Sequence, residues 1–376
     1  MKPGPCRNVL HAFALGAAGI LTIACSSIRA SDRGWQAAAS DTALRQIMER
    51  DKLPSLSVAV SVDGVLAYQR ALGRADVAAA TPATPETVYS QGSVTKALTA
   101  TLALQLADGG KLNPDAPVQE YCAAFPDKSA VVTCRQLLAH TAGVRHYDYR
   151  RFAEDFMNGT AFESIPAAME KFSGDPLVAV PGDEYHYSSW GYVVVACALE
   201  NASGQSYAEL LRARILEPVN MTHSRIDESG RQPANLAAGY SLQDNGSWQL
   251  TDRQDPSDRY GAAGLLSTPT DMVRFADALL QGKLLGRAQR NTMWSSQPLA
   301  DGGVTGHGLG WDLDEKSGAV MKGGSSFDAT SYLYVLPAEG VSIAISTNLV
   351  LWGQGREELS AKLADIYGSP NTGAVE

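Results

Sequence analysis

The sequence predicts a mixed α/β protein of the α+β type, with one antiparallel sheet built from the N- and C-terminal segments and flanked by helices. A strong β-hairpin pattern stands near each end of the chain, at residues 55–70 and 331–346. The stretch between them is rich in helical periodicity, which predicts a helical insertion at roughly residues 91–255. Strands at both ends and helices between them are typical of this fold class.

Each hairpin has apolar residues in alternation and a turn that the chain can form easily. In the first hairpin, Leu56, Val58, Val60 and Val62 fall on one face, and Asp63-Gly64 tolerates the positive φ of a tight turn. In the second, residues 331–336 and 341–346 flank a Pro-Ala-Glu-Gly turn. We expect a helix before the first hairpin, at residues 42–50, and another after the second, at residues 355–367.

The middle of the chain shows apolar residues at helical spacing in several places. The clearest case is Leu98, Leu102 and Leu106, which recur every four residues before an Asp108-Gly109-Gly110 stop. Further helices are expected at residues 134–140, 165–172, 191–201 and 207–216.

Composition places the chain among globular proteins and argues against a nucleic-acid partner. The 376 residues are 45% hydrophobic and 19% charged, and the formal net charge is −9 with no basic run. The chain is long enough for one large domain, which we place at residues 31–368 with a short tail at 369–376.

The first 30 residues have the pattern of a secretory signal peptide. Lys2 and Arg7 precede an apolar run at residues 9–24, which is short for a membrane span. Cleavage after Ala30 would release a periplasmic or secreted protein, whereas cleavage before Cys25 would leave a lipid-anchored one. Loss of three cations with residues 1–30 would take the net charge from −9 to −12.

Export permits a disulfide, and three cysteines remain outside the expected signal peptide. Cys122 and Cys134 are the nearest pair in sequence, so we expect any bond between these two. Cys197 stands in an apolar run and is expected to be a buried, free thiol.

Ser93 and Lys96 form a Ser-x-x-Lys pattern at the start of the helix that contains Leu98. Residues three apart share a helix face, so the hydroxyl and the amine can meet. A partly desolvated amine can accept the proton of a serine nucleophile, and the helix start offers N–H groups for an oxyanion. The alternative is that Ser93 caps the helix and Lys96 is a solvated side chain.

Together with other motifs in the same order, the chain resembles the penicillin-recognising serine hydrolases: class C β-lactamases, D-alanyl-D-alanine carboxypeptidases and related esterases. The family's Tyr-x-Asn element falls on Tyr187-Ser188-Ser189, and its Lys-Thr-Gly element falls on Lys322-Gly323-Gly324. Supporting motifs match at residues 140–143, 217–221, 264–268 and 308–311. The resemblance implies a β-lactamase/transpeptidase-like fold. Within the family, the motifs of this chain look most like those of the mitochondrial β-lactamase-like members.

The resemblance implies acyl transfer and assigns the roles in it. Ser93 would be acylated, Lys96 and Tyr187 would handle its proton, and Lys322 would steer a substrate carboxylate. The backbone N–H groups of Ser93 and Ser325 would form the oxyanion hole. Ser189 replaces the asparagine that usually holds a substrate amide, which puts efficient β-lactam turnover in doubt.

The implied partner is a peptide-like amide, an ester or a β-lactam, with no cofactor, and the histidines lack metal-type spacing. His140 is interpreted as structural, while His146 and His186 are weaker candidates for substrate contact. The alternative function is a catalytically idle member that recognises peptides or forms filaments. The sequence leaves open the substrate and the oligomeric state.

Overall fold

The computed structural model describes residues 34–156, 161–228 and 231–368. The expected signal peptide, with both of its cleavage options, and the tail at residues 369–376 lie outside the described residues. Within them, no helix is both long enough and apolar enough to cross a membrane.

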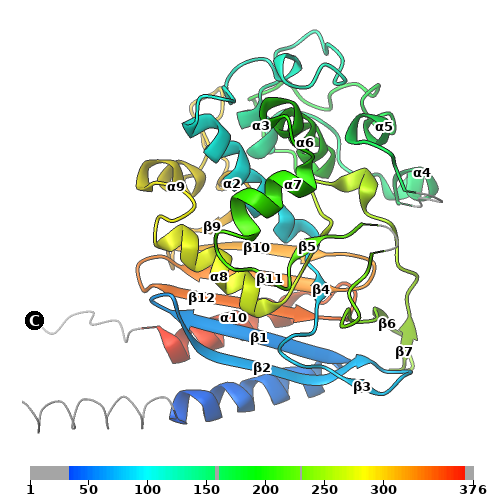
Figure 1. Cartoon of the computed structure of the whole chain (residues 1–376), viewed down its shortest axis with the longest axis vertical. Helices are drawn as coiled ribbons and strands as arrows, with labels where there is room; N and C mark the ends of the chain where they lie inside the picture. Colours follow the sequence, from blue (N-terminus) through cyan, green and yellow to red (C-terminus); the bar gives the residue numbers. More distant parts are fainter. Residues whose placement is uncertain (1–33, 157–160, 229–230, 369–376) are drawn as a thin grey trace, which may run out of the picture.

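A seven-stranded antiparallel sheet joins the two ends of the chain (Figure 1). The first hairpin, β1 and β2, pairs with the second, β11 and β12, through an antiparallel β1–β12 contact that sets Val58 opposite Ile345. The predicted sheet and both hairpins are therefore confirmed. The strands of the seven-stranded sheet, in spatial order, are β3 (Thr81–Pro82), β2 (Val65–Asp76), β1 (Ser55–Val62), β12 (Val341–Thr347), β11 (Thr330–Leu336), β10 (Ala319–Ser325) and β9 (Asp312–Asp314).

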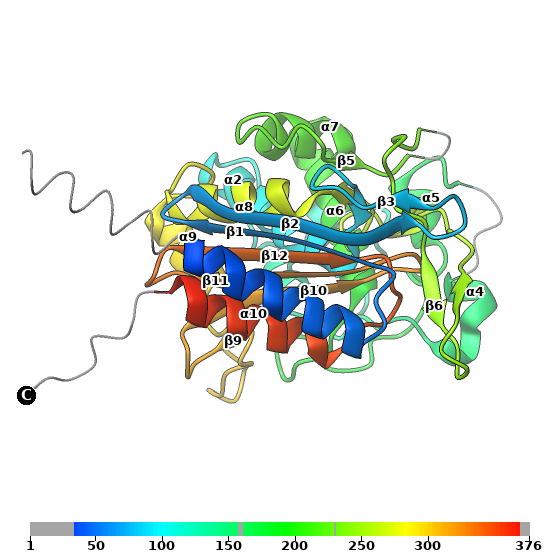
Figure 2. The ribbon, with the colours of Figure 1, turned by 90° about the horizontal axis from the view of Figure 1, so that it is seen from below.

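One face of the sheet is covered by the helix at residues 34–50 and by α10 (Gln354–Tyr367), which lie side by side (Figure 2). Leu44 and Ile47 of the first helix and Leu359 of α10 share an apolar core with the β1 side chains that the alternating pattern predicted. Arg50 also donates a hydrogen bond to Glu358 at 2.5 Å. The two terminal helices thus seal the face that points away from the helical part.

The opposite face is covered by α8 (Pro269–Leu280), which contacts β1 and β12. Apolar side chains of this face also share a core with α2 (Thr95–Asp108). Asp277 of α8 accepts hydrogen bonds from Ser61 and Ser342 at 2.6 and 2.8 Å, which explains why these strand serines are buried. Helix α8 is absent from our sequence expectations, although Thr268 supplies its N-cap and Pro269 its first turn.

The helical part packs around α2 and α6 (Ser189–Ser203), whose side chains form a second apolar core. The remaining helices are α3 (Cys134–Leu138), α4 (Phe152–Phe156), α5 (Ile165–Met169), α7 (Tyr207–Leu211) with a π-helical turn at Arg212–Leu216, and α9 (Arg287–Met293). Single 3₁₀ turns occur at η1 (Gly92–Val94), η2 (Val118–Glu120), η3 (Tyr149–Arg151) and η5 (Ser257–Arg259). Short strands complete the fold: β4 (Tyr89–Ser90), β5 (Arg225–Ile226) and β8 (Leu265–Ser267) in one sheet, and β6 (Tyr240–Leu242) and β7 (Trp248–Leu250) in another.

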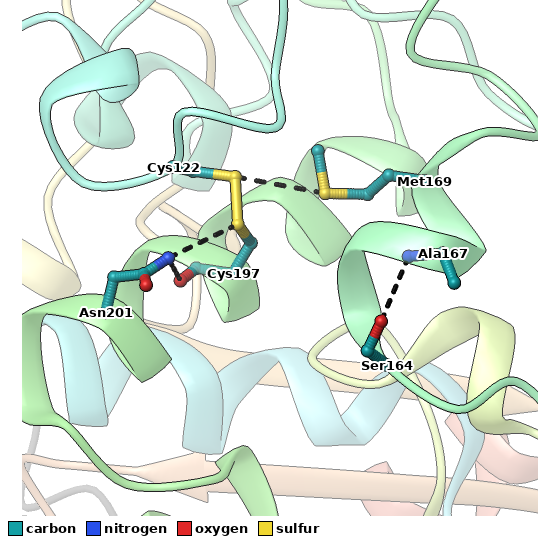
Figure 3. Close-up of a disulfide and its surroundings, with 6 residues drawn as sticks. All are labelled: Cys122, Ser164, Ala167, Met169, Cys197 and Asn201. Carbon is teal, nitrogen blue, oxygen red and sulfur yellow. Dashed lines mark hydrogen bonds between the residues drawn. A yellow bond between two sulfur atoms is a disulfide. The ribbon is translucent and has the colours of Figure 1, made fainter.

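The expected Cys122–Cys134 bond is wrong, because Cys122 is bonded to Cys197 (Figure 3). Their Cα atoms lie 5.6 Å apart although the two residues are 75 positions apart in sequence. Cys134 is the free, buried thiol, and burial raises its pKa to about 12. The prediction relied on the short distance between Cys122 and Cys134 along the sequence. In the structure, the packing of α6 instead brings Cys197 to Cys122 in the turn after η2.

Candidate active site

Ser93 lies in η1, in the short connection between β4 and α2. Its hydroxyl accepts hydrogen bonds from Lys96 Nζ at 3.0 Å and from the Tyr187 hydroxyl at 2.9 Å. The backbone before it is anchored, because Gln91 N–H donates to the Leu265 carbonyl at 2.8 Å. Two side chains from distant segments of the chain, Lys96 and Tyr187, therefore converge on the Ser93 oxygen.

Lys96 is fully buried, and three oxygens surround its amine. Besides Ser93, it donates to Ser189 Oγ and to the Ala262 carbonyl, each at 3.0 Å. Burial lowers the pKa of Lys96, and the nearby phenol of Tyr187 opposes that effect. An amine whose pKa is lowered in this way can give up and regain a proton more easily than one in water.

Tyr187 has an unusually acidic phenol for a buried tyrosine. Burial alone raises its pKa, but the charges of Lys96 and Lys322 outweigh burial and lower the pKa to about 8. The amines lie 5.1 Å (Lys96) and 5.2 Å (Lys322) from the ring centroid. With a pKa of about 8, the phenol is ionised to about one tenth at pH 7 and increasingly above it, and this phenolate is a competent general base.

The loop that carries Tyr187 is fixed by His140 and its neighbours. Ser188 N–H donates to His140 Nδ1 at 3.1 Å, and Ser188 Oγ donates to the Arg145 carbonyl at 2.8 Å. The His140 ring also packs against the Tyr187 ring, with centroids 4.4 Å apart and the planes tilted by 36°. Burial and the charge of Lys322 lower the pKa of His140 well below its usual range, so its imidazole is neutral and structural.

Lys322 is buried on β10 and is held by a carboxylate that our sequence interpretation missed. Its amine donates to Asp312 Oδ1 at 3.2 Å, and His307 Nδ1 lies 3.2 Å from the same oxygen. Asp312 comes directly after Trp311 of the Gly-Leu-Gly-Trp motif, but nothing in that motif indicates a pairing with Lys322. Asp312 therefore fixes the position of the cation beside Tyr187.

The end of β10 approaches the start of η1 very closely. A Cβ atom on Gly324 would lie 2.0 Å from the Gln91 carbonyl oxygen and 3.0 Å from Ser93 N, so only glycine fits. A Cβ on Gly92 would lie 2.7 Å from Ser325 N. The N–H groups of Ser93 and Ser325 thus lie in neighbouring segments, as an oxyanion hole requires.

Ser189, expected as a substrate contact, lies at the cavity wall with its hydroxyl bonded to Lys96. Its backbone N–H donates to His146 Nδ1 at 3.2 Å. Burial and the charge of Lys96 lower the pKa of His146 to about 4, so this acceptor is neutral. His146 lines the cavity, whereas His186 does not line it and lies beside Glu184 at 3.0 Å.

A cavity of about 430 Å³ opens directly onto Ser93. One part of its lining is aromatic, and another contains Arg356. The Arg356 guanidinium would meet a Cβ on Gly323 at 3.0 Å, and its buried Nε has no hydrogen-bond partner among the described residues. Arg356 lies in the first turn of the last helix, and our sequence predictions do not include it.

In the ranges 34–156, 161–228 and 231–368, no group of three or more His, Cys, Asp or Glu side chains could hold a metal ion.

A serine hydroxyl in contact with a buried lysine and an acidic tyrosine, at the junction of a sheet and a helical part, defines a serine hydrolase. The beta-lactamase family model matches residues 41–367, so the chain belongs to the beta-lactamase family. This membership confirms the resemblance and the fold class that the sequence predicts.

Individual proteins are also similar to the chain in sequence. It is 26% identical to the mitochondrial serine beta-lactamase-like protein LACTB of Mus musculus, over 81% of this chain and 73% of that protein. It is 28% identical to the Homo sapiens protein over 65% of this chain, and spans only 56% of the human protein's length.

Two solved structures show the same fold. EstCE1, a hydrolase with promiscuous acyltransferase activity, superposes with a TM-score of 0.77 at 20% identity, covering 91% of this chain and 100% of that one. A D-stereospecific amidohydrolase from Streptomyces sp. gives a TM-score of 0.72 at 23% identity, covering 90% and 99%.

Proposed function

We propose that this protein hydrolyses an ester or a peptide-like amide through an acyl-enzyme on Ser93. The observation that carries the proposal is the pair of contacts at Ser93 Oγ, 3.0 Å from Lys96 Nζ and 2.9 Å from the Tyr187 hydroxyl. One of the two similar structures is named an amidohydrolase and the other a hydrolase with acyltransferase activity, which supports the choice of an acyl-transfer substrate. They favour a working enzyme over an idle peptide-recognition or filament-forming member.

The reaction begins when Ser93 Oγ attacks the substrate carbonyl and passes its proton to the Tyr187 phenolate or to neutral Lys96. The resulting oxyanion accepts hydrogen bonds from the N–H groups of Ser93 and Ser325, each worth roughly a hundredfold or more in rate. Tyr187 returns the proton to the leaving group as the tetrahedral intermediate collapses. Water then attacks the acyl-enzyme by the same proton route.

The cation that binds a substrate carboxylate is better assigned to Arg356 than to Lys322 alone. Lys322 is 3% exposed and already contacts Asp312, so its charge is paired inside the site. Arg356 lines the cavity, lies near Gly323 and packs 5.4 Å from the Tyr332 ring centroid, and its Nε has no hydrogen-bond partner among the described residues. A guanidinium of this kind suits a carboxylate. Lys322 then acts mainly through the pKa of Tyr187.

We also propose that the protein is exported, to the periplasm or beyond the cell. The basic residues Lys2 and Arg7 before an apolar run support this, as does a disulfide between Cys122 and Cys197. Lipid attachment at Cys25 is the alternative exit, and mass spectrometry of the mature protein distinguishes the two.

The test is a panel of nitrophenyl butyrate, a D-Ala-D-Ala peptide and nitrocefin, assayed with the wild type and with Ser93→Ala. We expect turnover of the ester or the peptide and its loss by at least about a thousandfold in Ser93→Ala. Ser295→Ala, a change at an exposed serine after α9, is the matched control and should leave turnover unchanged. Turnover that survives Ser93→Ala would refute the proposal.

A further inference from the structure

One wall of the cavity beside Ser93 is built from five aromatic side chains that pack on one another. This aromatic wall consists of Tyr147, Tyr149, Phe152, Phe156 and Phe327. Phe156 is its centre, because the other four rings lie 4.9 to 5.9 Å from it: Tyr147 at 4.9 Å, Tyr149 and Phe152 at 5.1 Å, and Phe327 at 5.9 Å. The wall is therefore a continuous apolar surface.

The outer part of the aromatic wall is left open to solvent. Tyr149 is 72% exposed and Phe152 is 44% exposed, and Leu351, which also lines the cavity, is 78% exposed. Apolar surface gains free energy when it is removed from water, so a rim of this kind favours an apolar occupant. The cavity that the rim borders already contains Ser93, so the occupant is expected to be part of the substrate.

The positive charge of Arg259, behind the aromatic wall, does not turn the wall into an anion-binding site. Arg259 lies 5.8 Å from the ring centroids of both Tyr147 and Phe327, but it is paired with Asp258 at 2.5 Å. Arg259 is also only 7% exposed. The pairing leaves the wall itself apolar, whereas Arg356 provides a cation elsewhere in the same cavity.

The position of Phe327 relates the wall to the acyl half of the substrate. Phe327 follows the end of β10 by two residues, and that end carries the Ser325 N–H assigned to the oxyanion hole. A carbonyl held by this N–H would have its acyl substituent beside Phe327. We propose that the aromatic wall is an acyl-group subsite that selects esters and amides with a bulky apolar acyl group, aliphatic or aromatic.

This inference rests on the proposed acyl-enzyme function, and the experiment separates the two. Nitrophenyl acetate, butyrate, octanoate and phenylacetate share one leaving group and differ only in the acyl group. We expect kcat/KM for octanoate or phenylacetate to exceed that for acetate by at least about tenfold, since apolar groups in such pockets discriminate on this scale.

Variants of the exposed part of the wall test the assignment without disturbing the buried Phe156. Phe152→Ala and Tyr149→Ala should each lower kcat/KM for the bulky ester by roughly fivefold or more, and by a larger factor than kcat/KM for the acetate ester. Trp35→Ala is the matched control, because Trp35 is a 63% exposed aromatic on the N-terminal helix, outside the cavity.

The possible outcomes distinguish the two claims. Acylation of Ser93 with no preference for bulky acyl groups, or with equal losses for all esters in Phe152→Ala, would overturn the aromatic subsite alone. Failure of every ester to acylate Ser93 would overturn the proposed function as well. A preference that is lost only in the wall variants supports the subsite.

Discussion

At the scale of single residues, two lysines together set the acidity of one phenol, that of Tyr187. Lys96 contacts Ser93 directly, whereas Lys322 lies 5.2 Å from the Tyr187 ring and is fixed by Asp312. Their charges together bring the pKa of Tyr187 to about 8 against the opposing effect of burial. The base form of Tyr187 is present above that pKa, so activity should rise with pH through this region.

Replacing Lys322 by methionine should therefore raise the pKa of Tyr187. Loss of one cation at this distance moves a pKa by about 1 pH unit or more, so the inflection in kcat/KM should move upward by that amount. The measurement is a pH–rate profile with an activated ester. Lys322→Arg keeps the charge and is the control.

An unchanged inflection in Lys322→Met, in a variant shown by its thermal unfolding to be folded, would contradict this role. A uniform loss of rate at all pH values would also contradict it, because that result indicates a purely structural lysine.

The sequence predicts only part of the site at this scale. Ser93 and Lys96 could be paired because helical spacing fixes their relation, and Tyr187 came from a motif. Asp312 and Arg356 could not be found, because they reach the site through a strand pairing and a helix start that no local pattern encodes. The aromatic wall was missed for the same reason, since Phe327 joins it from the far end of the chain.

At the scale of elements, the site is made where β10 presses against η1. The contact requires glycine at Gly324 of β10 and at Gly92 of η1. Ser331 Oγ of β11 also donates to the Gln91 carbonyl at 2.7 Å. The strand end and the helix start are therefore held at a fixed distance, which places two backbone N–H groups beside the Ser93 hydroxyl.

Gly324→Ala should separate these elements. Its Cβ would meet the Gln91 carbonyl oxygen at 2.0 Å, so the backbone must shift by more than the oxyanion hole tolerates. We expect kcat to fall by about a hundredfold or more, with a loss of roughly 1 to 3 kcal/mol in the free energy of unfolding. Steady-state kinetics and denaturant unfolding measure the two effects.

Gly174→Ala is the control for the glycine substitution, because a Cβ there meets nothing within 4 Å. Full activity in Gly324→Ala would show that the close approach of β10 to η1 does not matter for catalysis.

At the scale of the whole molecule, the two ends of the chain build one sheet, and the helical part rests on it. Alternating apolar residues and tight turns were strong enough to predict both hairpins. Apolar residues at helical spacing were strong enough to predict the terminal helices. The disulfide was predicted wrongly because the fold of the helical part, not the sequence distance, decides which cysteines meet. The short strands β4, β5 and β8 were missed because two or three residues show no period.

Removing the disulfide should weaken the whole molecule rather than the site. The bond closes a loop of 75 residues, and such a loop is expected to contribute about 4 kcal/mol by restricting the unfolded chain. The double variant Cys122→Ala with Cys197→Ala should unfold at a markedly lower denaturant concentration. Under native conditions its kcat should change little.

Cys134→Ala is a useful comparison, since this buried thiol takes part in no bond. This variant should lose only the part of the free energy of unfolding that comes from packing one small side chain. Equal stability of the double variant and the wild type would contradict the proposed contribution of the disulfide.

The central claim is that the Ser93 oxygen becomes transiently acylated. The most direct measurement is intact-protein and peptide mass spectrometry after acid quenching during turnover of an activated ester. We predict one added acyl group on the peptide that contains Ser93, and no adduct in Ser93→Ala. Continued turnover with the acyl group absent from Ser93, or found on another residue, would contradict the account.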